Sequence, residues 1–210
     1  METIPLSMQI AVVVFVVLAI AVLKRFLQVV PFLLDSMFRA RGSSALEGSV
    51  RVSHDRNLIA LVLLIPATLT AFRYRLWDPS FLERFSPDAR LGMVAAAIAV
   101  CLLLRYLLHL WLKPRRHADS WWLGYRTGHT WFILLMMLVL PTLGILYLFH
   151  VNDLTIKWFI IAELGFVYAL FLFRKAQILA LSCNPLLTFL YLCGLEILPA
   201  SMLVVSAMLL

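Results

Sequence analysis

The sequence predicts an all-α fold, a polytopic bundle of about six transmembrane helices within a single integral membrane domain over residues 1–210. Hydrophobic residues make up 63% of the chain and charged residues only 14%, whereas a soluble domain has about 25% charged residues. The apolar residues also form runs close to the roughly 20 residues that a helix needs to cross a bilayer. Little of the chain remains for a soluble catalytic domain, so we expect its function to reside in the membrane or on short loops.

The first apolar run, residues 7–23, is expected to be a membrane span rather than a cleaved signal peptide. No Lys or Arg precedes this run, and Lys24 and Arg25 close it as stop-transfer flanks do. Five further spans are expected at about residues 57–72, 91–112, 127–149, 154–173 and 186–208. The second, fourth and sixth spans contain a proline that predicts a kink: Pro66, Pro141 and Pro199.

The segment after the first span, about residues 26–39, has its apolar residues at helical spacing. These residues are Phe26, Leu27, Val30, Leu33, Leu34, Met37 and Phe38. Polar residues fall on the opposite side, among them Gln28, Asp35 and Arg39. The pattern is typical of an amphipathic helix in the cytoplasmic interface, or of a prolongation of the first span that bends at Pro31.

The distribution of basic residues predicts the orientation in the membrane. Of the 18 Lys and Arg residues, twelve fall in one set of expected loops and five in the other. The positive-inside rule then places both termini on the non-cytoplasmic side of a bacterial inner membrane. Five tryptophans near expected span ends fit an aromatic belt and support the same span limits: Trp111, Trp121, Trp122, Trp131 and Trp158. We therefore attribute the net charge of +7 to membrane anchoring and expect no nucleic-acid partner.

Four ionisable residues inside the expected spans are the main candidates for a functional site: Arg105, His109, Glu163 and Glu196. Glu196 is the only charge in the run from Pro185 to Leu210, and a charge at that depth costs at least about 2.5 kcal/mol to insert. Arg105 lies roughly 12 Å, and each glutamate roughly 15 Å, from the cytoplasmic end of its helix. Arg105 can therefore pair with either carboxylate, and the pair either fixes helix packing or forms part of a proton, ion or substrate pathway with Glu196 as the titrating group.

Two histidines suggest a different chemistry. His109 and His129 lie near the cytoplasmic ends of two consecutive antiparallel spans, so their imidazoles can reach a similar depth and ligate one haem b or metal. The alternative is that they only cap or anchor helix ends. No third ligand, attachment motif or carboxylate stands beside either one, so no other cofactor and no protein metal site are expected.

Motifs of the common enzyme classes are missing from the sequence. It contains no HExxH, no GxSxG, no Walker A sequence and no acidic cluster for magnesium and phosphate. The three cysteines form no CxxC pair. The chain is therefore not expected to be an enzyme.

The last part of the chain resembles a known family. Residues 189–199, which read FLYLCGLEILP, resemble the YLCxLEIxP signature of a domain-of-unknown-function family of small polytopic inner-membrane proteins from Bacteroidota. The resemblance extends over about the last hundred residues. It implies that Tyr191, Cys193, Glu196 and Pro199 are special positions, and it implies no particular substrate. Members usually have a Lys or Arg soon after the signature, whereas residues 200–210 have none.

From these observations we expect an accessory or structural subunit, or an assembly factor, that docks against another membrane protein. A small ion-coupled transporter or channel built around Glu196 is the first alternative, and a haem-binding membrane subunit is the second. The lipid bilayer is a partner in each case.

Overall fold

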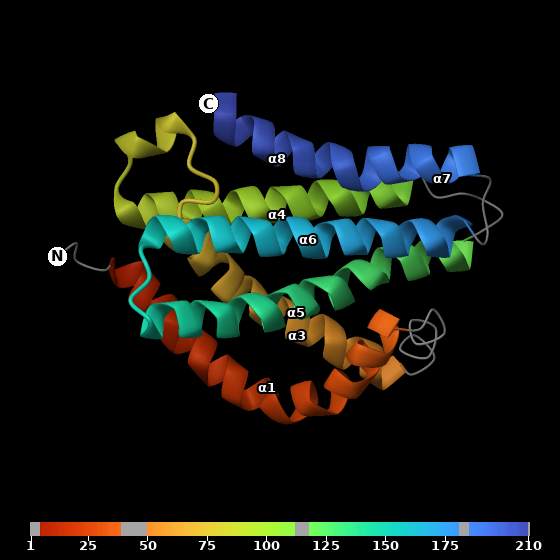
Figure 1. The fold of residues 1–210 in the computed structure, drawn as a ribbon, viewed down its shortest axis with the longest axis horizontal. Helices are drawn as coiled ribbons and strands as arrows, with labels where there is room; N and C mark the ends of the chain where they lie inside the picture. The colour runs from red at the N-terminus through yellow and green to blue at the C-terminus, as the bar shows by residue number, and fades with distance from the viewer. Residues whose placement is uncertain (1–4, 39–49, 112–117, 181–184, 210) are drawn as a thin grey trace.

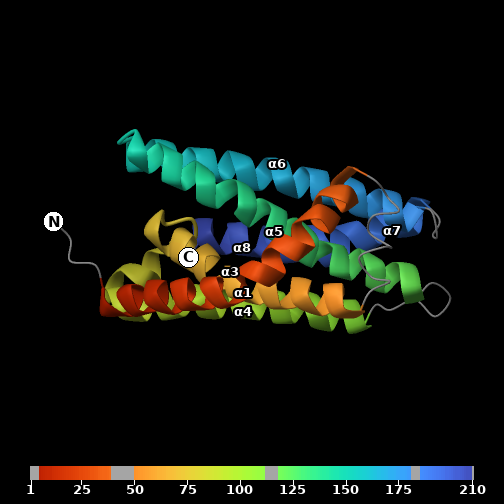
Figure 2. The same cartoon turned by 90° about the horizontal axis from the view of Figure 1, so that it is seen from below.

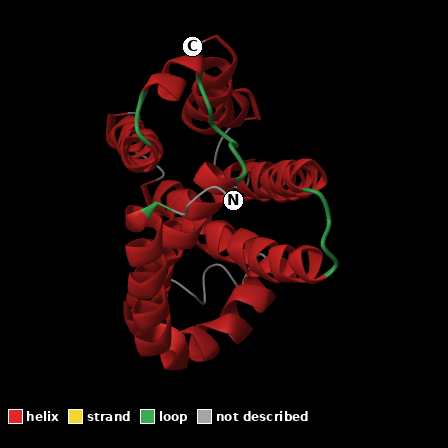
Figure 3. Cartoon of the chain, turned by 90° about the vertical axis from the view of Figure 1, so that its left-hand side faces the viewer, coloured by secondary structure: helices red, strands yellow, loops and turns green. Residues whose placement is uncertain are grey.

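The computed structural model describes residues 5–38, 50–111, 118–180 and 185–209, and this part of the chain is helical without a strand (Figure 3). Six of its helical segments are long and apolar enough to cross a membrane. The predicted all-α bundle with six spans is thus confirmed. The elements are α1 (Leu6–Phe38), α3 (Val50–Arg73), η1 (Ser80–Arg84), α4 (Pro87–Trp111), α5 (Ala118–Leu148), α6 (Asp153–Ala180), α7 (Pro185–Leu192), η2 (Cys193–Ile197) and α8 (Leu198–Leu209).

The long helices run roughly side by side along the longest dimension of the molecule (Figure 1). Contacts join α3 to α4 and α5, α5 to α6, α6 to α7, and α4 to both η2 and α8. These contacts close a ring of α3, α4, α5, α6 and the last span, and α1 lies outside this ring against α3 and α4. Side chains that point into the ring are therefore the ones shielded from lipid.

Helix α1 continues without interruption through residues 26–38. Of the two alternatives for this segment, a separate interfacial helix or a prolongation of the first span, the prolongation is the one observed. Its second half turns away from the direction of the first half (Figures 1 and 2), and Pro31 lies within this part. Val29 and Leu33 are 1% and 0% exposed and pack with Ile59 and Ile133. A proline removes one backbone hydrogen bond and commonly kinks a helix, and the bent segment lies against apolar residues of α3 and α5. Residue 39 lies outside the described residues.

Three helices extend beyond the expected spans at their Lys- and Arg-rich ends. Helix α3 begins at Val50, α5 begins at Ala118, and α6 continues to Ala180. As a result Arg56, Arg126 and Lys175, which we expected in loops, are helical. The expectation was wrong because a run of apolar residues ends at the first charge, whereas a helix continues wherever its buried face continues.

The last span is a composite of α7, one π-helical turn (η2) and α8. Pro199 lies two residues after the end of η2, at the second position of α8. It has no N–H to donate to the carbonyl of Leu195, and its ring crowds that carbonyl. The helix widens at this point, and the Leu198 N–H donates to the Cys193 carbonyl five residues earlier. The kink expected at Pro199 therefore takes the form of a π-turn, while Pro66 and Pro141 lie inside the continuous helices α3 and α5.

Candidate functional site

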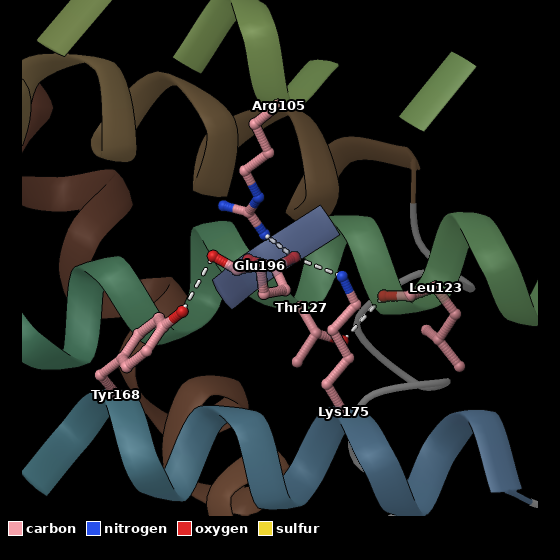
Figure 4. Close-up of polar contacts among 6 residues, drawn as sticks. All are labelled: Arg105, Leu123, Thr127, Tyr168, Lys175 and Glu196. Atoms are coloured by element: carbon pink, nitrogen blue, oxygen red, sulfur yellow. Dashed lines mark hydrogen bonds and ion pairs between the residues drawn. The ribbon is translucent and has the colours of Figure 1, made fainter. Parts of the chain in front are cut away.

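Three charged side chains meet inside the ring of helices: Arg105 of α4, Lys175 of α6 and Glu196 of η2 (Figure 4). We call these three residues the charge cluster. The Arg105 Nη2 donates to Glu196 Oε1 over 2.9 Å, and the Lys175 Nζ donates to the same oxygen. The side chains of Lys175 and Glu196 are only 2% and 5% exposed, and that of Arg105 is 20% exposed. The expected contact between Arg105 and Glu196 is present, and Lys175 joins it.

A glycine on α5 makes room for the Arg105 guanidinium. A Cβ atom on Gly128 would lie 3.0 Å from Nη1 and 3.1 Å from Cζ of Arg105, closer than side-chain atoms normally approach. The guanidinium carbon also lies 5.6 Å from the ring centres of Tyr125 and Phe171. Aromatic faces stabilise a cation at this distance when little water is present. Helix α5 therefore contributes space and a ring face to the site.

Lys175 lies on α6 where that helix extends beyond the expected span. Its Nζ is 5.9 Å from the Phe171 ring centre, and its Cε is in ordinary contact distance, 3.6 Å, of a Cβ built on Gly124. Sequence reasoning missed Lys175 because a basic residue at the end of an apolar run resembles a membrane flank. The sequence carries only a weak signal, because Ile178 and Leu179 continue the apolar spacing of α6 beyond Lys175. That Lys175 is itself on the buried face is seen only in the structure.

Tyr168 holds the backbone at Glu196. Its hydroxyl donates to the Glu196 main-chain carbonyl over 3.0 Å (Figure 4). Tyr168 and Lys175 are seven residues apart on α6 and therefore share one face of the helix. One face of α6 thus binds both the main chain and the carboxylate of Glu196.

Glu163 lies apart from the charge cluster. Its Oε1 accepts a hydrogen bond from Thr142 Oγ1 of α5 over 2.8 Å, and its Oε2 is a buried atom without a hydrogen-bond partner among the residues that the structure describes. Along α6 it is about 18 Å from Lys175. Of the two carboxylates, Arg105 therefore pairs with Glu196, while Glu163 bonds to α5. The similar depth expected for the two was wrong, because α6 continues to Ala180 and Glu163 lies farther from that end of the bundle.

The two candidate histidines both contact Tyr125. The His109 ring is 2% exposed, stacks on Tyr125 at 4.6 Å and meets the edge of Trp122 at 5.1 Å. The His129 ring lies 5.6 Å from Tyr125, and its Nδ1 is 3.1 Å from Asn57 Oδ1. Among the described residues there is no group of three or more His, Cys, Asp or Glu that could hold a metal ion. A haem between the two histidines stays a prediction.

The remaining positions named by the resemblance surround Glu196 in the chain. Tyr191 packs beside the buried Leu179 and Leu195, and Cys193 begins the π-turn. Pro199 is buried two residues after that turn. These residues shape the segment that presents Glu196 to α4 and α6.

The charge cluster has a surplus of one positive charge when all three groups are ionised. Arginine stays protonated in proteins, so Arg105 and Glu196 form a neutral pair and Lys175 is the additional cation. An uncompensated charge in a poorly solvated region is costly. The cluster becomes neutral when Lys175 releases a proton, and it is also neutralised when a second anion approaches.

The resemblance of residues 189–199 to the family of small inner-membrane proteins likewise stays a prediction. In the comparisons with known proteins, no family model, no curated protein and no solved structure matches this chain.

Proposed function

We propose that the chain is a small ion-coupled membrane transporter in which the charge cluster exchanges a proton. The observation that supports the proposal is the sharing of one carboxylate oxygen, Glu196 Oε1, by two cationic side chains from different helices. Intramembrane ionisable residues commonly mark the pathways of protons, ions or polar substrates. The ring of helices provides a lipid-shielded place for such a pathway.

The charge balance assigns different roles to the three residues. Protonation of Glu196 would leave two cations facing each other, whereas loss of a proton from Lys175 leaves the neutral pair of Arg105 and Glu196. Lys175 is therefore the proton-exchanging group, and Glu196 is its counter-ion. This assignment replaces the expectation that Glu196 itself titrates.

The π-turn supplies a means of coupling proton exchange to movement. Single π-turns occur frequently at functional sites and are limited in extent. A shift of one residue in the register of η2 turns a side chain by about 100° about the helix axis. Such a shift would take the Glu196 carboxylate away from Lys175, and the Tyr168 hydrogen bond to the Glu196 carbonyl is the contact that it would break.

A second candidate function is an accessory subunit or assembly factor. It is favoured because the ion pairs of the same cluster hold several helices together. The side chains of the cluster connect α4, α6 and η2 within one chain. Ion pairs of this kind fix the packing of the helices, and with it the outer surface that a partner membrane protein would recognise. This role requires no proton exchange.

Proton flux into liposomes distinguishes the two candidates. The purified protein is reconstituted with a pH-sensitive dye enclosed, and a pH step is applied to wild type, Lys175→Met and Lys157→Met. Lys157 is on the same helix, α6, outside the charge cluster, and is the matched control. The transporter proposal expects dissipation by wild type and Lys157→Met and its loss in Lys175→Met, with all three proteins folded by circular dichroism.

Equal flux in wild type and Lys175→Met would reject the role of Lys175. No flux above empty liposomes, together with a stoichiometric membrane protein that co-purifies in mild detergent, would favour the accessory subunit.

A further inference from the structure

A second polar site lies between α1 and α3, away from the charge cluster. It is an open surface pocket of about 570 Å³ lined by Arg25, Val50, Arg51, His54 and Asp55. Two arginines and a histidine from two helices converge on it, against a single carboxylate. The pocket therefore has a positive balance of charge, and neither Arg25 nor Arg51 takes part in the proposed proton exchange.

We propose that this pocket binds the phosphate group of an anionic phospholipid. Guanidinium groups present planar N–H forks that match phosphate oxygens, and basic pockets between transmembrane helices bind lipid head groups.

Arg25 is held in place at the edge of the pocket. Its Nη1 donates to Asp55 Oδ1 over 3.2 Å, and the Asp55 side chain is 11% exposed while that of Arg25 is 50% exposed. The buried carboxylate fixes one side of the guanidinium. The exposed half leaves further N–H donors directed away from Asp55, since a guanidinium has five of them.

The described start of α3 adds further cationic side chains to the pocket. Val50 lines the pocket, and the first turn of the described helix contains no acidic residue. Arg51 and His54 are exposed on the same two turns, so two side-chain donors come from one short segment.

The surfaces next to the pocket favour a lipid over a dissolved phosphate. Leu18 lies seven residues before Arg25 on α1, and Leu61 lies seven residues after His54 on α3, so each shares a helix face with its polar counterpart. Leu18 is 37% exposed and Leu61 is 67% exposed, and both belong to membrane spans. A lipid whose phosphate occupies the pocket can lay its acyl chains against these residues.

Lipid-dependent thermal stability of the full-length protein in neutral detergent tests the proposal. The probes are phosphatidylglycerol, phosphatidylcholine and inorganic phosphate, added separately. We expect phosphatidylglycerol to raise the Tm in a saturable manner, and phosphatidylcholine and phosphate to have little effect. Arg51→Gln should weaken the apparent affinity for phosphatidylglycerol about tenfold, as the loss of a charge-assisted contact does.

Two further variants control for charge and for folding. Arg84→Gln removes one positive charge from an exposed residue of η1, outside the pocket, and should bind as wild type does. The pair Arg25→Gln with Asp55→Asn removes the arginine fork without leaving a buried carboxylate unpaired, and should lose affinity as Arg51→Gln does.

If inorganic phosphate raised the Tm as much as phosphatidylglycerol does, the pocket would bind dissolved phosphate and the proposal of a lipid ligand would be overturned. Unchanged affinity in Arg51→Gln, or an equal loss in Arg84→Gln, would overturn the pocket as the binding site.

Discussion

At the scale of single residues, the space around the Arg105 guanidinium determines whether the charge cluster can form. Gly128→Ala should push the guanidinium from Glu196 Oε1, because the new Cβ would lie 3.0 Å from Nη1. We expect a loss of about 1 to 3 kcal/mol in the free energy of unfolding, as for other overpacked sites. Thermal unfolding in detergent measures the effect.

Gly144→Ala, on the same helix, is the matched control because its Cβ position has no atom within 4 Å apart from the nearby backbone of its own helix. It should leave stability unchanged or raise it by up to about 1 kcal/mol. In an Arg105→Ala background Gly128→Ala should become nearly harmless. A persistent loss in that background would mean that Gly128 is required for some other reason.

The second intramembrane carboxylate gives a separate prediction. Thr142→Val removes the hydroxyl that donates to Glu163 Oε1 and leaves the carboxylate without that bond. An unsatisfied buried polar group costs about 1 to 3 kcal/mol, more when it is charged. Denaturation of Thr142→Val, of Glu163→Gln and of the double variant measures the coupling. If the loss of stability in the double variant equals the sum of the losses in Thr142→Val and Glu163→Gln, the hydrogen bond between the two residues contributes no stability.

The sequence predicted part of this site. Arg105 and Glu196 stand out because each is a lone charge within an apolar run, and similar depth suggested their contact. Lys175 was missed because a basic residue at the end of an apolar run can be either a membrane flank or a buried ion-pair partner. Only the neighbouring helices decide between these two roles. Gly128 was not identified because the closeness of two helices at one point is a property of their packing.

At the scale of secondary-structure elements, Pro199 sets the direction of Glu196. Pro199→Ala should allow η2 to return to an α-helix, which would turn Glu196 away from Lys175 and Arg105. A proline in a helix interior ordinarily costs about 3 kcal/mol relative to alanine. We nevertheless expect Pro199→Ala to lower the Tm in detergent, because the ion pairs are lost.

Pro141→Ala is the control, since Pro141 lies inside the continuous helix α5 and is exposed. It should raise the Tm or leave it unchanged. A rise in Tm of similar size in Pro199→Ala and Pro141→Ala would show that the π-turn does not position Glu196.

The existence of the helices was predictable from hydropathy, but their ends were less so. Helices α3, α5 and α6 continue past the last apolar run because a few buried residues still face the bundle there. The buried Arg56, which is 1% exposed, is such a case in α3. A hydropathy average cannot find these positions, because it weighs all faces of a helix equally.

At the scale of the whole molecule, the order of helices around the ring was not predictable. Several arrangements bury equal amounts of apolar surface, and lipid tails do not discriminate between one apolar helix face and another. Polar contacts do discriminate, since each has few possible partners. The charge cluster joins α4, α6 and the last span. The bond between Thr142 and Glu163 and the contact of Asn57 with His129 each join two particular helices.

Orientation in the membrane gives a prediction for the whole chain. In a variant with its native cysteines replaced by serine, a cysteine introduced at Asn152 should react with a membrane-impermeant maleimide in intact cells. A cysteine at Arg51, at the opposite end of the bundle, should react only after permeabilisation. The reason is the excess of Lys and Arg at the Arg51 end. Labelling in the reverse pattern would invert the orientation.

The central claim is that Glu196 joins α4 and α6 through two cations, and a mutant cycle tests it most directly. The stability of Glu196→Ala, Lys175→Met and the double variant is measured in detergent at one pH. Glu196→Ala should lose about 3 to 5 kcal/mol, because it leaves the buried Lys175 and the partly buried Arg105 without a counter-ion. Lys175→Met should lose less, since Arg105 and Glu196 remain a neutral pair. The account predicts that the double variant is more stable than Glu196→Ala alone; losses that add within about 0.5 kcal/mol would contradict it.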